Sequence, residues 1–178
     1  MNASSSIQTT YAASTDTFTV TGFLTQFTKT SLPADSHTAS GSYTLTATVN
    51  DSGALVTGIL LVTGSVNDLG FHSPSDPGLL KVNLTQFGFS GSQNSTVFEF
   101  IGNVTGGSLS SYYSTGQVGI VLNPGTGTNF GGSFASDFHG GSAGAGTVDN
   151  FGVPEPATLG LLLAGGVALL ARRRRKSC

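Results

Sequence analysis

Apolar and polar residues alternate in short runs over most of residues 16–138. The clearest run covers residues 43–49, where Tyr, Leu, Ala and Val occupy every second position and threonines occupy the positions between them. Side chains along a strand point alternately to the two faces of a sheet, so this run predicts a strand with one apolar face and one threonine face. The Asp-Ser-Gly sequence at residues 51–53 then predicts a hairpin turn into a second strand.

Similar alternation predicts further strands along the chain. It returns at residues 17–21, 80–84, 98–100 and 118–122. After residue 84 the apolar positions shift by one, which predicts a β-bulge near Thr85 and Gln86. A last strand is predicted at residues 130–138, where three phenylalanines share one parity. Seven or more short strands separated by turn-forming residues indicate an all-β fold over residues 1–138, either an antiparallel β-sandwich or a barrel-like sheet.

The end of the chain has a different character. Residues 139–152 are rich in Gly, Ser and Ala without periodicity, which predicts a flexible linker. An apolar run follows at residues 159–171, and we expect a transmembrane helix over residues 158–171. This run is shorter than the roughly 20 residues that usually cross a bilayer, so it would be a short span.

Charge is segregated along the chain. Charged residues make up only 9% of the sequence, and five of the seven basic residues form one cluster, Arg172, Arg173, Arg174, Arg175 and Lys176. This cluster follows the apolar run, so by the positive-inside rule it would hold that end in the cytoplasm and leave the β-rich domain outside. The rest of the chain is mildly acidic, which argues against nucleic-acid binding. A single cysteine excludes an internal disulfide.

The segment before the apolar run carries a family resemblance. Val153, Pro154, Glu155 and Pro156, then the short apolar segment, then the terminal arginines closely resemble the PEP-CTERM sorting signal. The resemblance covers about 25 residues, 153–178, and implies that this element is recognised by an exosortase, a membrane protease of Gram-negative bacteria that secrete exopolysaccharide. It also implies export, a brief membrane anchorage and release to the cell surface or extracellular matrix.

Export requires a leader. Residues 1–15 are polar and do not resemble a secretory signal peptide. We therefore expect either that the true start of the protein lies upstream of Met1 or that the chain is a fragment.

Candidate catalytic residues are few. His37, His72 and His139 lie in polar, turn-like sequences, so we expect surface loops rather than metal or catalytic roles. Residues 140–144 match the pattern G-x-S-x-G, but no helix is predicted after them, so chance explains the match better than a nucleophile elbow. The sequence thus predicts no catalytic residue, no metal site, no cofactor and no enzymatic activity.

The function that these patterns favour is a structural protein of the extracellular matrix. The alternative is a module that binds exopolysaccharide, for which exposed aromatic rings are required; Tyr112 and Tyr113 are the obvious candidates. A secreted hydrolase is a third class, and it would need clustered carboxylates in a cleft or a pair of nucleophile and base.

Overall fold

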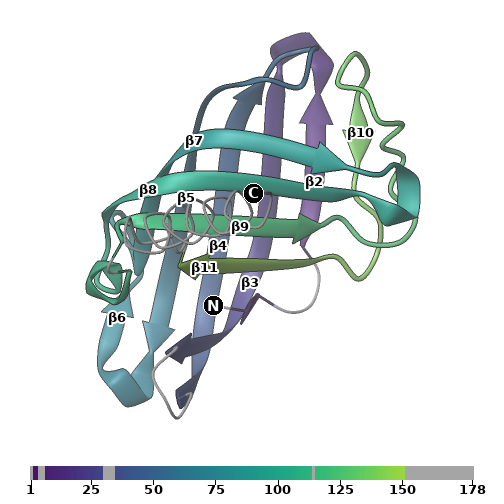
Figure 1. The fold of residues 1–178 in the computed structure, drawn as a ribbon. Helices are drawn as coiled ribbons and strands as arrows, with labels where there is room; N and C mark the ends of the chain where they lie inside the picture. Colours follow the sequence, from purple (N-terminus) through teal and green to yellow (C-terminus); the bar gives the residue numbers. More distant parts are fainter. Residues whose placement is uncertain (1, 4–6, 30–34, 114, 151–178) are drawn as a thin grey trace, which may run out of the picture.

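The computed structural model describes residues 2–3, 7–29, 35–113 and 115–150, which form one antiparallel sheet curled across itself (Figure 1). Its strands are β1 (Asn2–Ala3), β2 (Gln8–Ala12), β3 (Thr17–Lys29), β4 (Asp35–Val49), β5 (Leu55–Val66), β6 (Phe71–Ser73), β7 (Leu80–Ser90), β8 (Val97–Gly106), β9 (Gln117–Asn123), β10 (Phe138–His139) and β11 (Ala145–Asn150). Short 3₁₀ turns lie at η1 (Ala13–Thr15), η2 (Asn67–Leu69), η3 (Gln93–Ser95) and η4 (Ser110–Tyr112). The predicted all-β antiparallel class is confirmed, and of the two predicted architectures the structure shows the curled, barrel-like sheet.

The sheet folds into two crossed layers. Strands β7, β8, β9 and β11 form a front layer that runs across a back layer of β2, β3, β4 and β5 (Figure 1). Strand β7 joins the layers, because its residues 80–83 pair with β5 while the whole strand pairs with β8. The β7–β8 register shifts between Leu84 and Gln86, which confirms the predicted bulge. A bulge bends and twists a strand, so it helps β7 to turn out of the back layer.

The back layer has the two faces that the alternation predicts. In β4, Tyr43, Leu45, Ala47 and Val49 are buried, whereas the hydroxyl side chains between them face outward. The predicted hairpin after β4 is also present, with Gly53 at the positive φ of 77° that favours glycine.

Phenylalanine rings fill the space between the layers. Phe18 of β3 packs edge-on against Phe98 of β8, with ring centroids 5.1 Å apart, and lies 5.5 Å from Phe100. All three side chains are almost completely buried. Burial of each such side chain contributes roughly 1.5–3 kcal/mol, so these rings hold the front layer onto the back layer.

The prediction of a strand over residues 130–138 is wrong. Only Phe138 and His139 are in a strand, and residues 124–137 form an irregular segment that we call the phenylalanine loop. Phe130 and Phe134 of this loop are buried nonetheless. Phe134 packs edge-on against Tyr11 at 5.0 Å, and Phe130 packs against Phe98 at 5.1 Å. The regular spacing of these phenylalanines therefore reflects rings inserted into the core rather than the period of a strand.

The predicted linker is also wrong for its described part. Residues 145–150 form β11, which pairs with β9 from Ala145–Asn123 to Asn150–Val118. The glycines serve close packing here: a Cβ on Gly146 would lie 2.8 Å from Cδ2 of Leu122 and 2.9 Å from the Tyr43 hydroxyl. Residues 139–150 thus belong to the β domain, and residues 151–152 lie outside the described residues.

No helix in the described part of the chain is long and apolar enough to cross a membrane. The predicted transmembrane helix at residues 158–171 lies outside that part.

The phenylalanine loop should contribute to stability as a core element does. Replacing Phe134 with Ala removes a buried ring, and we expect the free energy of unfolding to fall by about 3–5 kcal/mol in urea denaturation. Phe23→Ala is the control, because the Phe23 side chain is 63% exposed, and it should change stability by less than about 0.5 kcal/mol. Equal effects of the two substitutions would contradict this account of the loop.

The assignment of residues 145–150 to the sheet can be tested separately. Val148 is only 8% exposed, so Val148→Asp would bury an uncompensated carboxylate and lower the free energy of unfolding by about 3 kcal/mol or more. Ala145→Asp places the same carboxylate at an exposed position of the same strand and should be nearly neutral. If thermal denaturation shows that both substitutions are neutral, residues 145–150 behave as a linker and not as part of the sheet.

Candidate functional site

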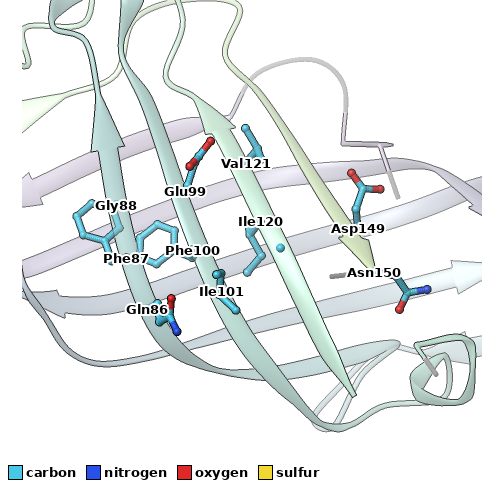
Figure 2. A pocket seen from close by; sticks show the side chains of 11 residues that line it. Gln86, Phe87, Gly88, Glu99, Phe100, Ile101, Ile120, Val121, Asp149 and Asn150 are labelled. Carbon is cyan, nitrogen blue, oxygen red and sulfur yellow. The ribbon is translucent and has the colours of Figure 1, made fainter. Parts of the chain in front are cut away.

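A groove of about 450 Å³ lies on the front layer (Figure 2). Its floor is hollow because two outward positions are glycines. The register places Gly88 beside Glu99, and Gly119 beside Ile101 and Asp149. The groove thus combines an aliphatic floor with acidic and amide side chains at its sides.

The two carboxylates of the groove stand apart. Glu99 comes from β8 and Asp149 from β11, and Figure 2 shows them on opposite sides of β9. Two strand spacings of about 4.8 Å each, roughly 10 Å, separate the strands that carry them. The two acidic side chains therefore come from strands that are not neighbours and line opposite sides of the groove.

The outer face of the back layer carries a second candidate site. Phe23 of β3 projects from this face and is 63% exposed. Beside it lies a hollow of about 400 Å³, lined also by Gln8, Thr21, Ser42 and Thr44. This is an aromatic ring among hydroxyl and amide groups, and sequence reasoning did not identify it. Its only sequence signal is a phenylalanine at a position where the alternation of β3 calls for a polar residue.

Tyr112 and Tyr113, which we expected to be exposed, do not form an exposed aromatic surface. Tyr113 is buried, and burial together with the nearby carboxylate of Asp149 raises the pKa of its hydroxyl. Tyr112 packs edge-on against Phe27 and Phe71, with ring centroids at 5.4 and 6.0 Å. Tyr113 therefore offers no open face to a ligand, and Tyr112 is only partly exposed.

His37 is not in a surface loop, contrary to our expectation. It lies in β4, is 9% exposed, and stacks on Phe27 with ring centroids 6.3 Å apart. Its Nδ1–H donates a hydrogen bond of 2.6 Å to Oδ2 of Asp68. Its Nε2 lies 3.0 Å from Oδ2 of Asp35, without hydrogen-bond geometry. This histidine ties the β3–β4 hairpin to the turn η2.

The other sequence candidates have simple structural positions. His72 and His139 are exposed, on β6 and β10. In the G-x-S-x-G match, the backbone of Ser142 exchanges hydrogen bonds with Thr126, so residues 140–144 are bridged to a loop and do not form a strand–helix elbow. Across residues 2–3, 7–29, 35–113 and 115–150, no three His, Cys, Asp or Glu side chains gather in a metal-binding arrangement.

The predicted sorting residues lie outside the described residues. These are Val153, Pro154, Glu155 and Pro156, and the basic cluster of Arg172, Arg173, Arg174, Arg175 and Lys176.

Comparison with known proteins identifies the end of the chain. Residues 152–176 match the family model of the PEP-CTERM protein-sorting motif. No curated protein matches the chain, and no solved structure does. The chain therefore carries a PEP-CTERM sorting signal, as the resemblance predicted. This signal supports an extracellular protein that is exported, passes through the membrane and is processed by an exosortase-type system.

The contact between His37 and Asp68 should make stability depend on pH. The hydrogen bond from His37 holds the pKa of Asp68 below its usual value. A lowered folded-state pKa gives stability that is present above about pH 4 and is lost as the pH falls through the folded-state pKa. Asp68→Asn should therefore destabilise the protein at pH 7, and the difference from the wild type should shrink in acid. Asp51→Asn, in an exposed turn, is the control for urea denaturation at pH 7 and pH 3; a constant difference would refute the linkage.

Proposed function

We propose that this chain is a structural protein of the extracellular matrix, delivered to the surface of a Gram-negative cell by its carboxyl-terminal signal. The observation that carries the proposal is the PEP-CTERM match at residues 152–176, which directly follows a folded β domain that ends at Asn150. The matrix, biofilm and exopolysaccharide association is the part that goes beyond the match.

The signal would work in three steps. The apolar residues 158–171 enter the membrane, and the basic residues 172–176 keep the carboxyl end in the cytoplasm, so that the β domain is outside. The exosortase-type protease then recognises Val153, Pro154, Glu155 and Pro156. Because proline lacks a backbone donor and favours extended structure, this segment would fit a protease that binds an extended chain. Cleavage near it releases the domain.

The structure supports a domain that remains intact after cleavage. Strand β11 ends at Asn150, so Pro154 can lie at most about 14 Å further along the chain. Every described strand is on the amino-terminal side of the signal. Loss of the signal therefore removes nothing from the sheet.

A structural role fits the surface of this domain. The outward residues of the back layer are mainly threonines, which favour strands and remain hydrated without charge. We propose no enzymatic activity, since the two acidic side chains of the front groove come from strands that are not neighbours and His37 is engaged in contacts within the fold.

The alternative function is a module that binds exopolysaccharide. The exposed ring of Phe23 favours it, because sugar recognition commonly uses an accessible aromatic face. The two functions are compatible, since a matrix protein can be held in place by the polymer that it contacts.

The sorting step is tested by replacing Pro154, Glu155 and Pro156 together with Ala. We expect the variant to accumulate in the membrane fraction with residues 157–178 still attached, whereas the wild type is shortened and found in the extracellular matrix fraction. Immunoblots of the fractions and mass spectrometry of the carboxyl-terminal peptide measure this. Asp149→Asn, in the folded domain, should be processed normally.

Two results would contradict the proposal. Normal shortening and release of the triple variant would show that the motif does not direct processing. A processed wild-type protein that is recovered entirely from the clarified medium, with none in the matrix, would refute the structural role.

A further inference from the structure

We infer that the outer face of the back layer, centred on Phe23, binds a neutral polysaccharide. This inference rests on the proposed extracellular function and adds the site and the chemical class of the ligand. The occupant is an uncharged polymer of hydroxylated sugar rings.

The first observation is that this face is uncharged. The register aligns the outward side chains in rows across four strands. They are Gln8, Thr10 and Ala12 on β2; Thr17, Thr19, Thr21 and Phe23 on β3; Ser42, Thr44, Thr46 and Thr48 on β4; and Thr57, Ile59, Leu61 and Thr63 on β5. None of these side chains ionises. Hydroxyl and amide groups can both donate and accept hydrogen bonds, as sugar hydroxyls do.

A charged side chain at the β7 edge of this face is engaged in an ion pair. Lys81 of β7 borders the face beside Leu61, and its Nζ lies 2.9 Å from both carboxylate oxygens of Asp76. The face therefore offers no net charge to attract an ionic ligand. This distinguishes it from the front groove, where Glu99 and Asp149 would repel an acidic polymer.

The second observation is the position of Phe23. Its side chain is 63% exposed, and the neighbours across the sheet are small: Ser42 is directly opposite on β4, and Thr63 follows on β5. Ser42 and Thr63 are within 3.2 Å of each other through their hydroxyl oxygens. The ring thus stands above a low, polar surface. A sugar presents C–H groups on its ring face and hydroxyls at its edge, so it can stack on Phe23 while its edge meets these hydroxyls.

The third observation is the hollow beside the ring. It has a volume of about 400 Å³ and is lined by Gln8, Thr21, Phe23, Ser42 and Thr44, with backbone from Gly22 and Tyr43. This is within the range of small-molecule sites, which combine an apolar surface with a few polar groups. The front groove lacks an aromatic platform, because the rings of Phe87 and Phe100 pack on each other at 4.5 Å toward the core.

A protein partner fits this face less well. The buried core of a protein interface gathers apolar and aromatic side chains into one patch. Here the exposed apolar residues Phe23 and Ile59 are separated by hydroxyl side chains. Single exposed apolar side chains surrounded by hydroxyl groups suit a sugar ring, which has an apolar face and a polar edge.

The test is affinity electrophoresis of the purified full chain in native gels that contain dextran, hydroxyethyl cellulose or galactomannan, with the anionic polymer alginate as the charged comparison. We expect retardation by at least one neutral polymer and none by alginate. Phe23→Ala should weaken binding about ten-fold, as loss of one stacked ring predicts, and Phe23→Tyr should retain it.

The control variant is Val56→Ala. Val56 is 65% exposed, close to the value for Phe23, and belongs to the same layer. It lies beside the Thr48 end of β4, about 20 Å along the strand from the Ser42 that faces Phe23. Val56→Ala should bind as the wild type does.

Each remaining outcome overturns the inference. These outcomes are no retardation by any neutral polymer, equal retardation by alginate, and equal losses in Phe23→Ala and Val56→Ala.

If sedimentation shows that Phe23→Ala abolishes self-association and leaves polymer binding unchanged, the face is a contact between copies of the chain. Phe23→Ala should be sorted and shortened normally, whereas the triple variant of residues 154–156 should still bind polymer, so a failure of one proposal is distinguishable from a failure of the other.

Discussion

The packing of phenylalanine rings between the crossed layers is the interaction on which the rest of the structure depends. One sheet that curls across itself encloses an interior that only large side chains fill, and here Phe18, Phe98, Phe130 and Phe138 meet at 4.7–6.0 Å. The chain has a single cysteine and 9% charged residues, so disulfides and dense ion pairing contribute nothing comparable in the described domain. Because the interior supplies the stability, the outer face of the back layer is free to consist of hydroxyl side chains.

Alternation was enough to predict the elements whose backbone is regular. The two-residue alternation predicts strands β4 and β9, and its phase shift predicts the bulge in β7. A sheet with one buried face imposes this period on the sequence. The phenylalanine loop could not be predicted in this way. Phe130 and Phe134 are buried although their backbone is irregular. A buried ring in the sequence does not reveal whether its backbone pairs in a strand. The hydrogen-bond partner of His37, Asp68, comes from a separate turn, so the burial of His37 could not be predicted from the residues around it.

The glycines explain why residues 145–150 were wrongly predicted to be a linker, and the correction has a consequence for sorting. The sequence alone does not distinguish a glycine that allows close packing from a glycine in a linker. Gly146 is needed for packing, because it lets Tyr43 and Leu122 lie against its strand. The sheet consequently continues to Asn150, and the Pro-Glu-Pro segment begins only four residues later. A protease that recognises this segment must act beside a folded surface, with at most about 14 Å of chain between them. The sorting residues themselves could be predicted from sequence alone, because their recognition depends on order and composition and not on a fold.

The low charge of the domain also limits how it can associate with a matrix. Across residues 1–150 the only Lys or Arg side chains are Lys29 and Lys81, and Lys81 is held by Asp76. Attraction of an acidic polymer by a basic patch is therefore not available to this surface. In the proposed matrix role, contacts would instead come from hydrogen bonds and from apolar area, and the back layer presents both together around Phe23. The same hydroxyl side chains that keep the sheet hydrated without charge would then determine which polymers it contacts, namely those that carry no charge themselves.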